Sequence, residues 1–149
     1  MAVSSDHLLQ CGRLYGAVRY DVRAPIEQVW HCHCSMCRKL HGAIFVSIGL
    51  VKRAYFALSG EDNMGMHKNW PSVLRRFCKT CGSQIISESD KDLYMVELAL
   101  GSLDPDQTPG HADDKKLHIY WESKIAWYEP ADDLPKTREY GDPLDDSQP

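Results

Sequence analysis

The sequence predicts a mainly β protein, on three observations. Short apolar or alternating segments recur along the chain, and turn-forming residues separate them. Only Ser35 to His41 has the character of a helical turn, with Ser35 as its cap and Gly42 as its stop. Five of the six cysteines fall in two tight clusters, a pattern typical of metal ions that cross-link small domains.

The expected strands follow one another along most of the chain. Residues 14–22 alternate small or apolar side chains with polar ones and include Val18 and Tyr20, which is typical of a strand. Residues 43–51 form a nearly continuous apolar run, which suits a strand buried on both faces or the arm of a core hairpin. We expect the other strands at 29–34, 55–58, 73–77, 84–87, 93–100 and 117–121, with a polar loop from Asp104 to Lys116.

The length of 149 residues fits one domain, which we expect to span residues 1–140. Residues 141–149 are rich in acid and proline, and we expect them to form a disordered tail. A domain of this size can bury a real core, yet it is small enough to gain from a metal cross-link.

The composition excludes several classes of function. The net charge is −4 and no basic stretch interleaves with aromatic residues, so nucleic acid is not an expected partner. No apolar run reaches the length that spans a membrane. Residues 1–10 lack the features of a secretory signal, which predicts a cytoplasmic location where clustered cysteines favour metal. Three disulfides are the alternative for an exported protein, although Cys-x-Cys spacing suits them poorly.

Both cysteine clusters have the spacing of zinc ligands. The first, Cys32-His33-Cys34-Ser35-Met36-Cys37, can bring three thiolates to one small cation. The second, Cys78-Lys79-Thr80-Cys81, lies between two expected strands and so is expected at the tip of a hairpin. The residues alone leave open whether the metal is a structural staple or a reaction centre. One structural zinc held by Cys34, Cys37, Cys78 and Cys81 is a further arrangement that the spacing allows.

Several further motifs accompany the clusters in a definite order: Gly16-Ala17-Val18-Arg19-Tyr20, Cys32 to Lys39, Ser59-Gly60-Glu61, Arg75 to Ser83, Gly101-Ser102-Leu103-Asp104, His118-Ile119, Ser123-Lys124 to Trp127, and Asp133-Leu134-Pro135. In this order the chain resembles the glutathione-dependent formaldehyde-activating enzyme family, which includes the centromere protein V domain. The resemblance implies a zinc-stapled β-tent of folded antiparallel sheets with short helical turns. It also implies two zinc sites, a structural one with four thiolates and a catalytic one with three.

Carried over by position, the resemblance makes Cys32, Cys34 and Cys37 the catalytic zinc ligands. Zinc takes four ligands, so three protein ligands leave one position for water or substrate. A thiol that enters this position loses its proton and becomes a nucleophile at neutral pH. The implied enzyme is a carbon–sulfur lyase that adds glutathione to formaldehyde to give S-hydroxymethylglutathione. Arg38 and Lys39 are candidates for binding the anionic substrate, with a solvated turn as the alternative.

The structural zinc site departs from the family pattern. Family members usually carry Cys-x-Cys directly before the Gly-Ala-Val-Arg-Tyr strand, and here Arg13 and Tyr15 stand at those positions. Cys78 and Cys81 remain in register, and Cys11 is a candidate replacement ligand. We therefore expect one zinc per chain, or two if Cys11 restores the second site. In a third arrangement, Arg13, Tyr15 and packing replace the structural metal.

Three histidines are candidates for proton transfer, together with a bound water. His33 lies between two ligands, so an extended backbone would point its side chain away from the metal. His41 and His118 could face the site, although a structural role is the simpler interpretation of each.

A non-catalytic zinc-binding module for protein interaction is the alternative function, and the altered structural site favours it. Association into a homodimer would be the commonest closed assembly. Trp127 and Tyr128 could line a pocket, but aromatic residues at the end of a strand more often belong to the core. The acidic pair Asp132-Asp133 is expected to be solvated.

Overall fold

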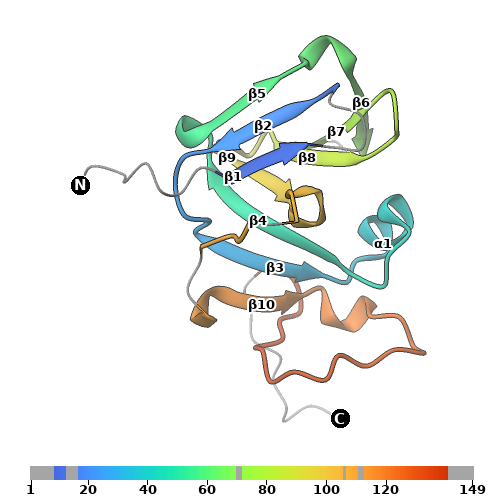
Figure 1. The fold of residues 1–149 in the computed structure, drawn as a ribbon. Coiled ribbons are helices and arrows are strands. Elements are labelled where there is room, and N and C mark those ends of the chain that lie inside the picture. Colours follow the sequence, from blue (N-terminus) through green and yellow to red (C-terminus); the bar gives the residue numbers. More distant parts are fainter. Residues whose placement is uncertain (1–8, 13–16, 70–71, 106, 111–112, 141–149) are drawn as a thin grey trace. The chain divides into compact units, whose positions relative to one another are not determined.

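The computed structural model describes residues 9–12, 17–69, 72–105, 107–110 and 113–140. The chain divides into two compact units, and each is described only through these residues. The first unit takes residues 1–28 and 49–111, and the second takes residues 29–48 and 112–149. The predicted mainly β fold is confirmed, since two sheets and a single α-helix account for the regular structure of the described residues (Figure 1).

A small antiparallel sheet belongs to the first unit. Its strands are β1 (Leu9–Gly12), β2 (Arg19–Val22) and β5 (Phe56–Ser59), in the order β1-β2-β5 (Figure 1). Tyr20 and Val22 are buried while their neighbours on β2 are half-buried, which is the alternation that predicted a strand here. Residues 13–16 of the expected strand lie outside the described residues.

Side-chain contacts join two of the sequence motifs in this unit. The Arg19 guanidinium lies 3.2 Å from the Asp104 carboxylate. The Tyr20 hydroxyl lies 2.8 Å from Ser102 Oγ, and Ser102 donates in turn to the carbonyl of Ala99. Because Ser102 donates its hydroxyl proton to the Ala99 carbonyl, the Tyr20 hydroxyl must be the donor in the bond between Tyr20 and Ser102. These motif residues therefore hold the fold together within the first unit.

A larger group of strands completes the first unit, in the order β4-β9-β8-β7-β6. The strands are β4 (Val46–Lys52, which crosses from the second unit into the first), β6 (Met64–Asn69), β7 (Val73–Cys78), β8 (Gln84–Ser89) and β9 (Asp92–Ala99). Neighbouring strands from β6 to β9 are antiparallel, and their core residues include Ile85, Ile86, Val96 and Leu98. The second cysteine cluster lies at the β7–β8 turn, so the predicted hairpin tip is confirmed.

Gly60 is expected to be among the least replaceable residues of this unit. Its φ is +81°, and a Cβ atom there would collide with the carbonyl oxygen of Ala17. We expect Gly60→Ala to lower the free energy of unfolding by about 3 kcal/mol, through left-handed strain and the collision together. Gly82→Ala is the matched control, because Gly82 has φ +77° but no atom within 4 Å of an added Cβ. In urea denaturation, Gly82→Ala should lower the free energy of unfolding by about 1 kcal/mol. Equal losses in the two variants would contradict the steric argument.

The second unit consists of β3 (Gln28–Cys32), α1 (Ser35–His41), the start of β4 and β10 (Lys116–Ile119). Figure 1 shows β10 beside β3 and α1 directly after β3. The β3–β10 pair is parallel, with Ile119 opposite Cys32, which differs from the antiparallel arrangement that the family resemblance implies. The buried cluster of this unit comprises Cys32, Cys37, Val46, Ile48 and Ile119.

Short 3-10 helices connect the strands of both units. In the second unit, the strand expected at 117–121 ends early, because Tyr120 adopts a left-handed conformation with φ 53° and the next residues form such a helix. The 3-10 helices span Arg53–Tyr55, Glu61–Asn63, Leu100–Ser102, Asp113–Lys115 and Trp121–Ser123.

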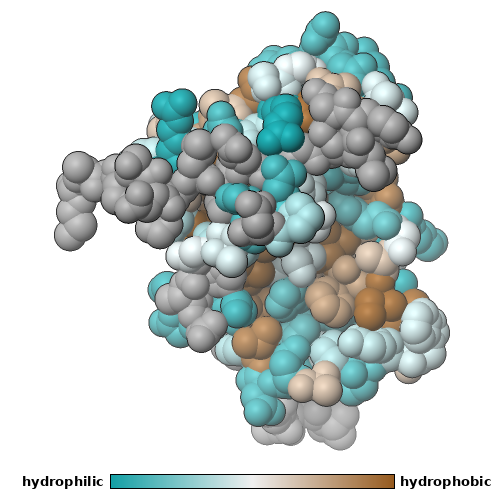
Figure 2. Space-filling model, viewed as in Figure 1, coloured by the Kyte–Doolittle hydropathy of each residue, from teal (hydrophilic) through white to brown (hydrophobic). Residues whose placement is uncertain are grey.

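On the face drawn in Figure 2, the coloured residues are mainly hydrophilic or neutral. Figure 2 shows hydrophobic residues among them, several of which lie side by side in the middle and right of the view. In the part of the chain that the structure describes, no helix has the length and apolar character needed to cross a membrane.

Candidate metal centre

Three thiols of the second unit meet at the junction of β3 and α1. The sulfur atoms of Cys32, Cys34 and Cys37 all lie within 4.8 Å of one another, and those of Cys32 and Cys37 are 3.6 Å apart. Cys32 and Cys37 are buried and Cys34 is half-buried. None of the three is in a disulfide. The spacing predicted from the sequence therefore does bring the three sulfur atoms to one place.

The start of the helix explains how the thiols converge. Cys34 is the N-cap residue of α1, with an extended backbone, and its Sγ accepts a hydrogen bond of 3.3 Å from the Cys37 N–H. The prediction that Ser35 caps the helix is wrong by one residue, because the sulfur of Cys34 takes the capping position that a hydroxyl usually fills. Gly42 ends the helix in a left-handed conformation, as predicted.

The neighbouring thiols disfavour ionisation of Cys32. Hydrogen bonds with Cys34 and Cys37, followed by burial, raise the pKa of the Cys32 thiol far above its ordinary value. Neighbouring thiolates repel each other, so the cluster keeps its protons unless a cation compensates the charge. Three sulfur donors around one point fit a soft or borderline divalent ion.

His33 lies between two of the thiols and is fully buried. Its backbone N–H donates to the carbonyl of Ile119 at 3.1 Å, and its side-chain Nε2 lies 2.8 Å from Nδ1 of His118. Burial, followed by the charges of His118 and His31, lowers the pKa of His33 to about 4. His33 is therefore neutral at physiological pH.

His118 connects His33 to Asp132. Its Nε2 lies 3.0 and 3.1 Å from the two carboxylate oxygens of Asp132, and its ring is completely buried. Asp132 is exposed, as expected, but its carboxylate also accepts from His118 and from the Leu134 N–H. These two donors lower the pKa of Asp132 against the opposing effect of burial.

Aromatic rings surround the two histidines. Phe45 and Trp121 each pack with their ring centroids 5.1 Å from that of His33. His31, a residue that the sequence analysis did not single out, bonds Ser47 Oγ at 2.8 Å and packs against His118 at 5.2 Å. The only sequence signal for His31 is its position one residue before the first thiol. His33, the residue between Cys32 and Cys34 in the sequence, thus belongs to a packed cluster of imidazole and aromatic rings.

Comparison with known proteins decides the family. The model of the glutathione-dependent formaldehyde-activating enzyme family matches residues 10–123, which is most of the chain. The chain belongs to this family. Membership and the three-thiol cluster together support a glutathione-related function of the kind that the family name describes.

A solved structure agrees at the level of the fold. The crystal structure of a Rhodobacter sphaeroides protein is similar to this member of the family, with 17% sequence identity and a TM-score of 0.53. The similarity covers 66% of this chain and 91% of the other. At this identity the likeness shows the fold alone. No curated protein matches the chain.

The two cations after the family's first cysteine motif differ in their surroundings. Arg38 is half-buried and donates to two carbonyls, from Nε to His33 at 3.1 Å and from Nη2 to Ser123 at 3.2 Å. These bonds join α1 to His33, which precedes the N-cap residue, and to the 3-10 helix Trp121–Ser123. Lys39 is exposed.

Removing the Arg38 side chain is expected to weaken the second unit. A charge-assisted hydrogen bond contributes roughly 1.5–3 kcal/mol, so we expect Arg38→Leu to lower the free energy of unfolding by about 2 kcal/mol. Arg38→Lys should recover only part of this loss, because an ammonium cannot reproduce the planar guanidinium fork. Lys39→Leu, at an exposed neighbouring position, should change stability by less than about 0.5 kcal/mol. Equal stability of the two leucine variants in chemical denaturation would contradict this role of Arg38.

The second cysteine cluster lies in the first unit. Cys78 is buried at the end of β7, where it accepts a hydrogen bond from the Asn63 amide at 3.5 Å. Cys81 Sγ lies 3.0 Å from the hydroxyl of Ser83. Cys11 stands opposite Tyr20 in the β1–β2 register. Arg13 and Tyr15, which replace the usual family cysteines, lie outside the described residues. Whether the chain keeps a structural zinc site therefore stays a prediction.

Two aromatic residues and His41 also have defined positions. Trp127 is 73% exposed and Tyr128 is 39% exposed, so the interpretation of these residues as core is wrong. Trp127 lies in a turn after the 3-10 helix Trp121–Ser123, and Tyr128 follows it, so neither residue ends a buried strand. His41 is half-buried as the last residue of α1.

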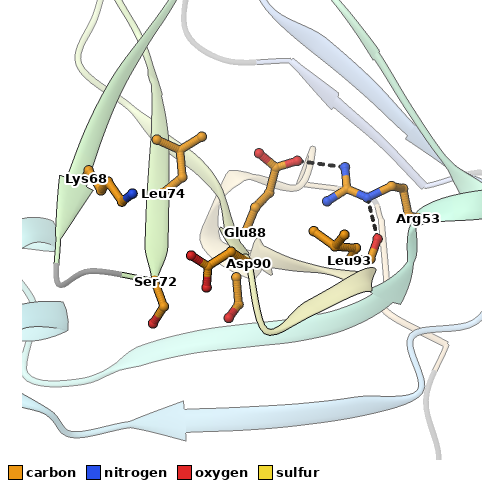
Figure 3. Close-up of a pocket in the computed structure, with 8 residues that line it drawn as sticks. Arg53, Lys68, Ser72, Leu74, Glu88, Asp90 and Leu93 are labelled. Carbon is orange, nitrogen blue, oxygen red and sulfur yellow. Dashed lines mark hydrogen bonds and ion pairs between the residues drawn. The ribbon is translucent and has the colours of Figure 1, made fainter.

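A pocket of about 350 Å³ lies in the first unit (Figure 3). Figure 3 shows the Arg53 guanidinium directed at Glu88, which it meets at 2.7 Å, and Glu88 also binds Arg76 at 2.8 Å. Lys68 and Leu74 lie on the opposite wall. Among the described residues, the wall contains no thiol or imidazole, and Glu88 is paired with both arginines.

Proposed function

We propose that this chain is a zinc-dependent carbon–sulfur lyase that acts on a small thiol adduct, such as S-hydroxymethylglutathione, in the cytoplasm. One observation carries the proposal. Three thiols, with no fourth ligand in the same group among the described residues, meet at one point in a chain of this family. A site with three protein ligands is the arrangement that leaves a position for a reactant.

In this proposal Cys32, Cys34 and Cys37 hold the ion. Bound zinc would act as a Lewis acid that lowers the pKa of a thiol sharing its coordination sphere. The protein favours the charged state of its own ligands through the Cys37 N–H, which donates to Cys34 Sγ. Burial of Cys32 and Cys37 keeps bulk water from two of the three sulfur atoms.

The reaction in the synthetic direction joins the sulfur of glutathione to the carbon of formaldehyde. The thiol gives up its proton, the carbon–oxygen double bond becomes a single bond, and the oxygen acquires a proton. Arg38 and Lys39 are the proposed contacts for the anionic glutathione. Arg38 keeps donor N–H groups beyond the two that bond carbonyls, and Lys39 is exposed at the next position.

Exchange spectroscopy tests this function without a coupled assay. In an NMR sample of glutathione and formaldehyde at equilibrium, zinc-loaded protein should raise the exchange rate between glutathione and its adduct in proportion to its concentration. Zinc-free protein is the control, and it should leave the rate at its spontaneous value. If zinc-loaded protein neither binds glutathione nor changes the exchange rate, the substrate assignment fails.

A zinc-binding module for protein interaction is the second candidate, and one observation favours it. Trp127, in the same unit as the thiols, is 73% exposed, and large exposed aromatic residues are enriched where proteins bind one another. Trp127→Ala separates the candidates. It should leave adduct exchange unchanged if the chain is an enzyme of the proposed kind, and it should abolish capture of a partner if the chain is an interaction module.

A further inference from the structure

Three side chains of the second unit form a continuous row of hydrogen bonds that ends at His33, which stands between two of the thiols in the sequence. The Asp132 carboxylate accepts from His118 Nε2 at 3.0 Å, and His118 Nδ1 lies 2.8 Å from His33 Nε2. His33 is the residue between Cys32 and Cys34. We call Asp132, His118 and His33 the histidine relay. It connects a carboxylate that is 40% exposed to the buried segment that carries two of the thiols.

The carboxylate sets the position of each proton along the histidine relay. An ionised Asp132 can only accept, so His118 carries its proton on Nε2. If Nδ1 of His118 carries no proton, its lone pair accepts from the Nε2–H of His33. The reverse polarity would place a proton on His33 Nδ1, which is buried and has no hydrogen-bond partner among the described residues. A buried donor without an acceptor is costly, so both rings are Nε2–H tautomers.

The rest of His33 is fixed as well. Its N–H donates to Ile119 at 3.1 Å, its carbonyl accepts from Arg38 at 3.1 Å, and its ring packs against Phe45 and Trp121. A residue held through its backbone and its ring cannot rotate freely. The directions of the side chains on either side of it are therefore restricted too.

We propose that Asp132 is a positioning residue, which acts through His118 and His33 to hold Cys32 and Cys34 in the arrangement that binds the metal. The inference rests on the proposed function only in taking the three thiols as the zinc site. Partners that orient metal ligands from outside the coordination sphere commonly change metal affinity 10–100-fold, which sets the scale of the effect.

Zinc affinity of matched variants tests the proposal. Competition with a chromophoric chelator should show about tenfold weaker zinc binding for Asp132→Leu. Asp132→Asn should bind almost as tightly as the native protein, because its amide oxygen can still accept from His118. Asp133→Leu is the control, since Asp133 is an exposed acid next in sequence and outside the histidine relay. If Asp132→Leu and Asp133→Leu bind zinc equally well, the proposal is wrong.

Nitrogen-15 NMR of the histidine rings gives a second readout that a general loss of packing would not produce. In the native protein both His33 and His118 should be Nε2–H tautomers, and Asp132→Leu should convert each to a mixture. A native His118 that carries its proton on Nδ1 would overturn the proposal, whether or not any variant folds. Neither readout depends on turnover. A native protein without lyase activity would thus reject the proposed function while this test still stands.

Discussion

Cys34→Ser is expected to abolish metal binding at the three-thiol site and to return adduct exchange to its spontaneous rate. Cys34 contributes one of three sulfur donors, and its Sγ also caps α1. We expect the protein-dependent exchange rate to fall by more than about 100-fold. This is the largest effect that is common when a residue that only orients a metal ligand is lost, and Cys34 is itself a proposed ligand. Cys34 is half-buried whereas Cys32 and Cys37 are core residues, so this variant disturbs the fold least among the three. A serine hydroxyl can still cap the helix.

Met36→Leu is the matched control for this variant. Met36 lies in the same helix, is 40% exposed and offers no thiolate. It should keep both the metal and the exchange activity. Zinc content by mass spectrometry and exchange by NMR should fall together in Cys34→Ser. A serine variant that keeps full exchange activity would show that this thiol is not part of the reaction.

Removal of the metal is expected to loosen the second unit far more than the first. Cys32 and Cys37 belong to the buried cluster that also contains Val46, Ile48 and Ile119. Without a cation, no bonded ion links these thiols to one another. Structural thiolate sites contribute apparent binding free energies on the order of 10 kcal/mol, so even a fraction of this would be a large part of a domain's stability.

Hydrogen exchange measured by mass spectrometry can locate this effect. After chelation, peptides from residues 29–48 and 113–140 should exchange faster, while those around Val96 and Leu98 should keep their protection, because these residues belong to the first unit. Reloading with zinc should restore the slow exchange. An equal loss of protection in both units would contradict the assignment of the metal to the second unit alone.

Much of the strand pattern could be predicted from apolar runs and turn residues. The segments expected at 84–87 and 93–100 correspond to β8 and β9, whose buried residues alternate or cluster along the strand. The strand β6 was not predicted, because Gly65, His67 and Lys68 interrupt its apolar pattern and Met66 is exposed. Pairing with β7 rather than a hydrophobic face makes this segment a strand.

The thiol cluster could be predicted because its spacing is local, whereas the histidine relay depends on contacts between distant residues. His33 and His118 are 85 residues apart in the chain, and Asp132 follows His118 after another 14. No periodicity connects such positions. The one local signal is that Asp132 accepts from the backbone of Leu134, a turn in which aspartate is favoured. That signal predicts a turn at Asp132 but gives no indication of its histidine partner.

In the proposed function, the three thiols form a metal site with room for one more thiol. Cobalt substituted for zinc reports the number of sulfur ligands through its charge-transfer absorption. We expect a three-sulfur spectrum in Cys78→Ser as well as in the native protein, with a further rise that saturates when glutathione binds. A four-sulfur spectrum before glutathione is added, lost in Cys78→Ser, would contradict this expectation and would favour a single structural ion shared by both cysteine clusters.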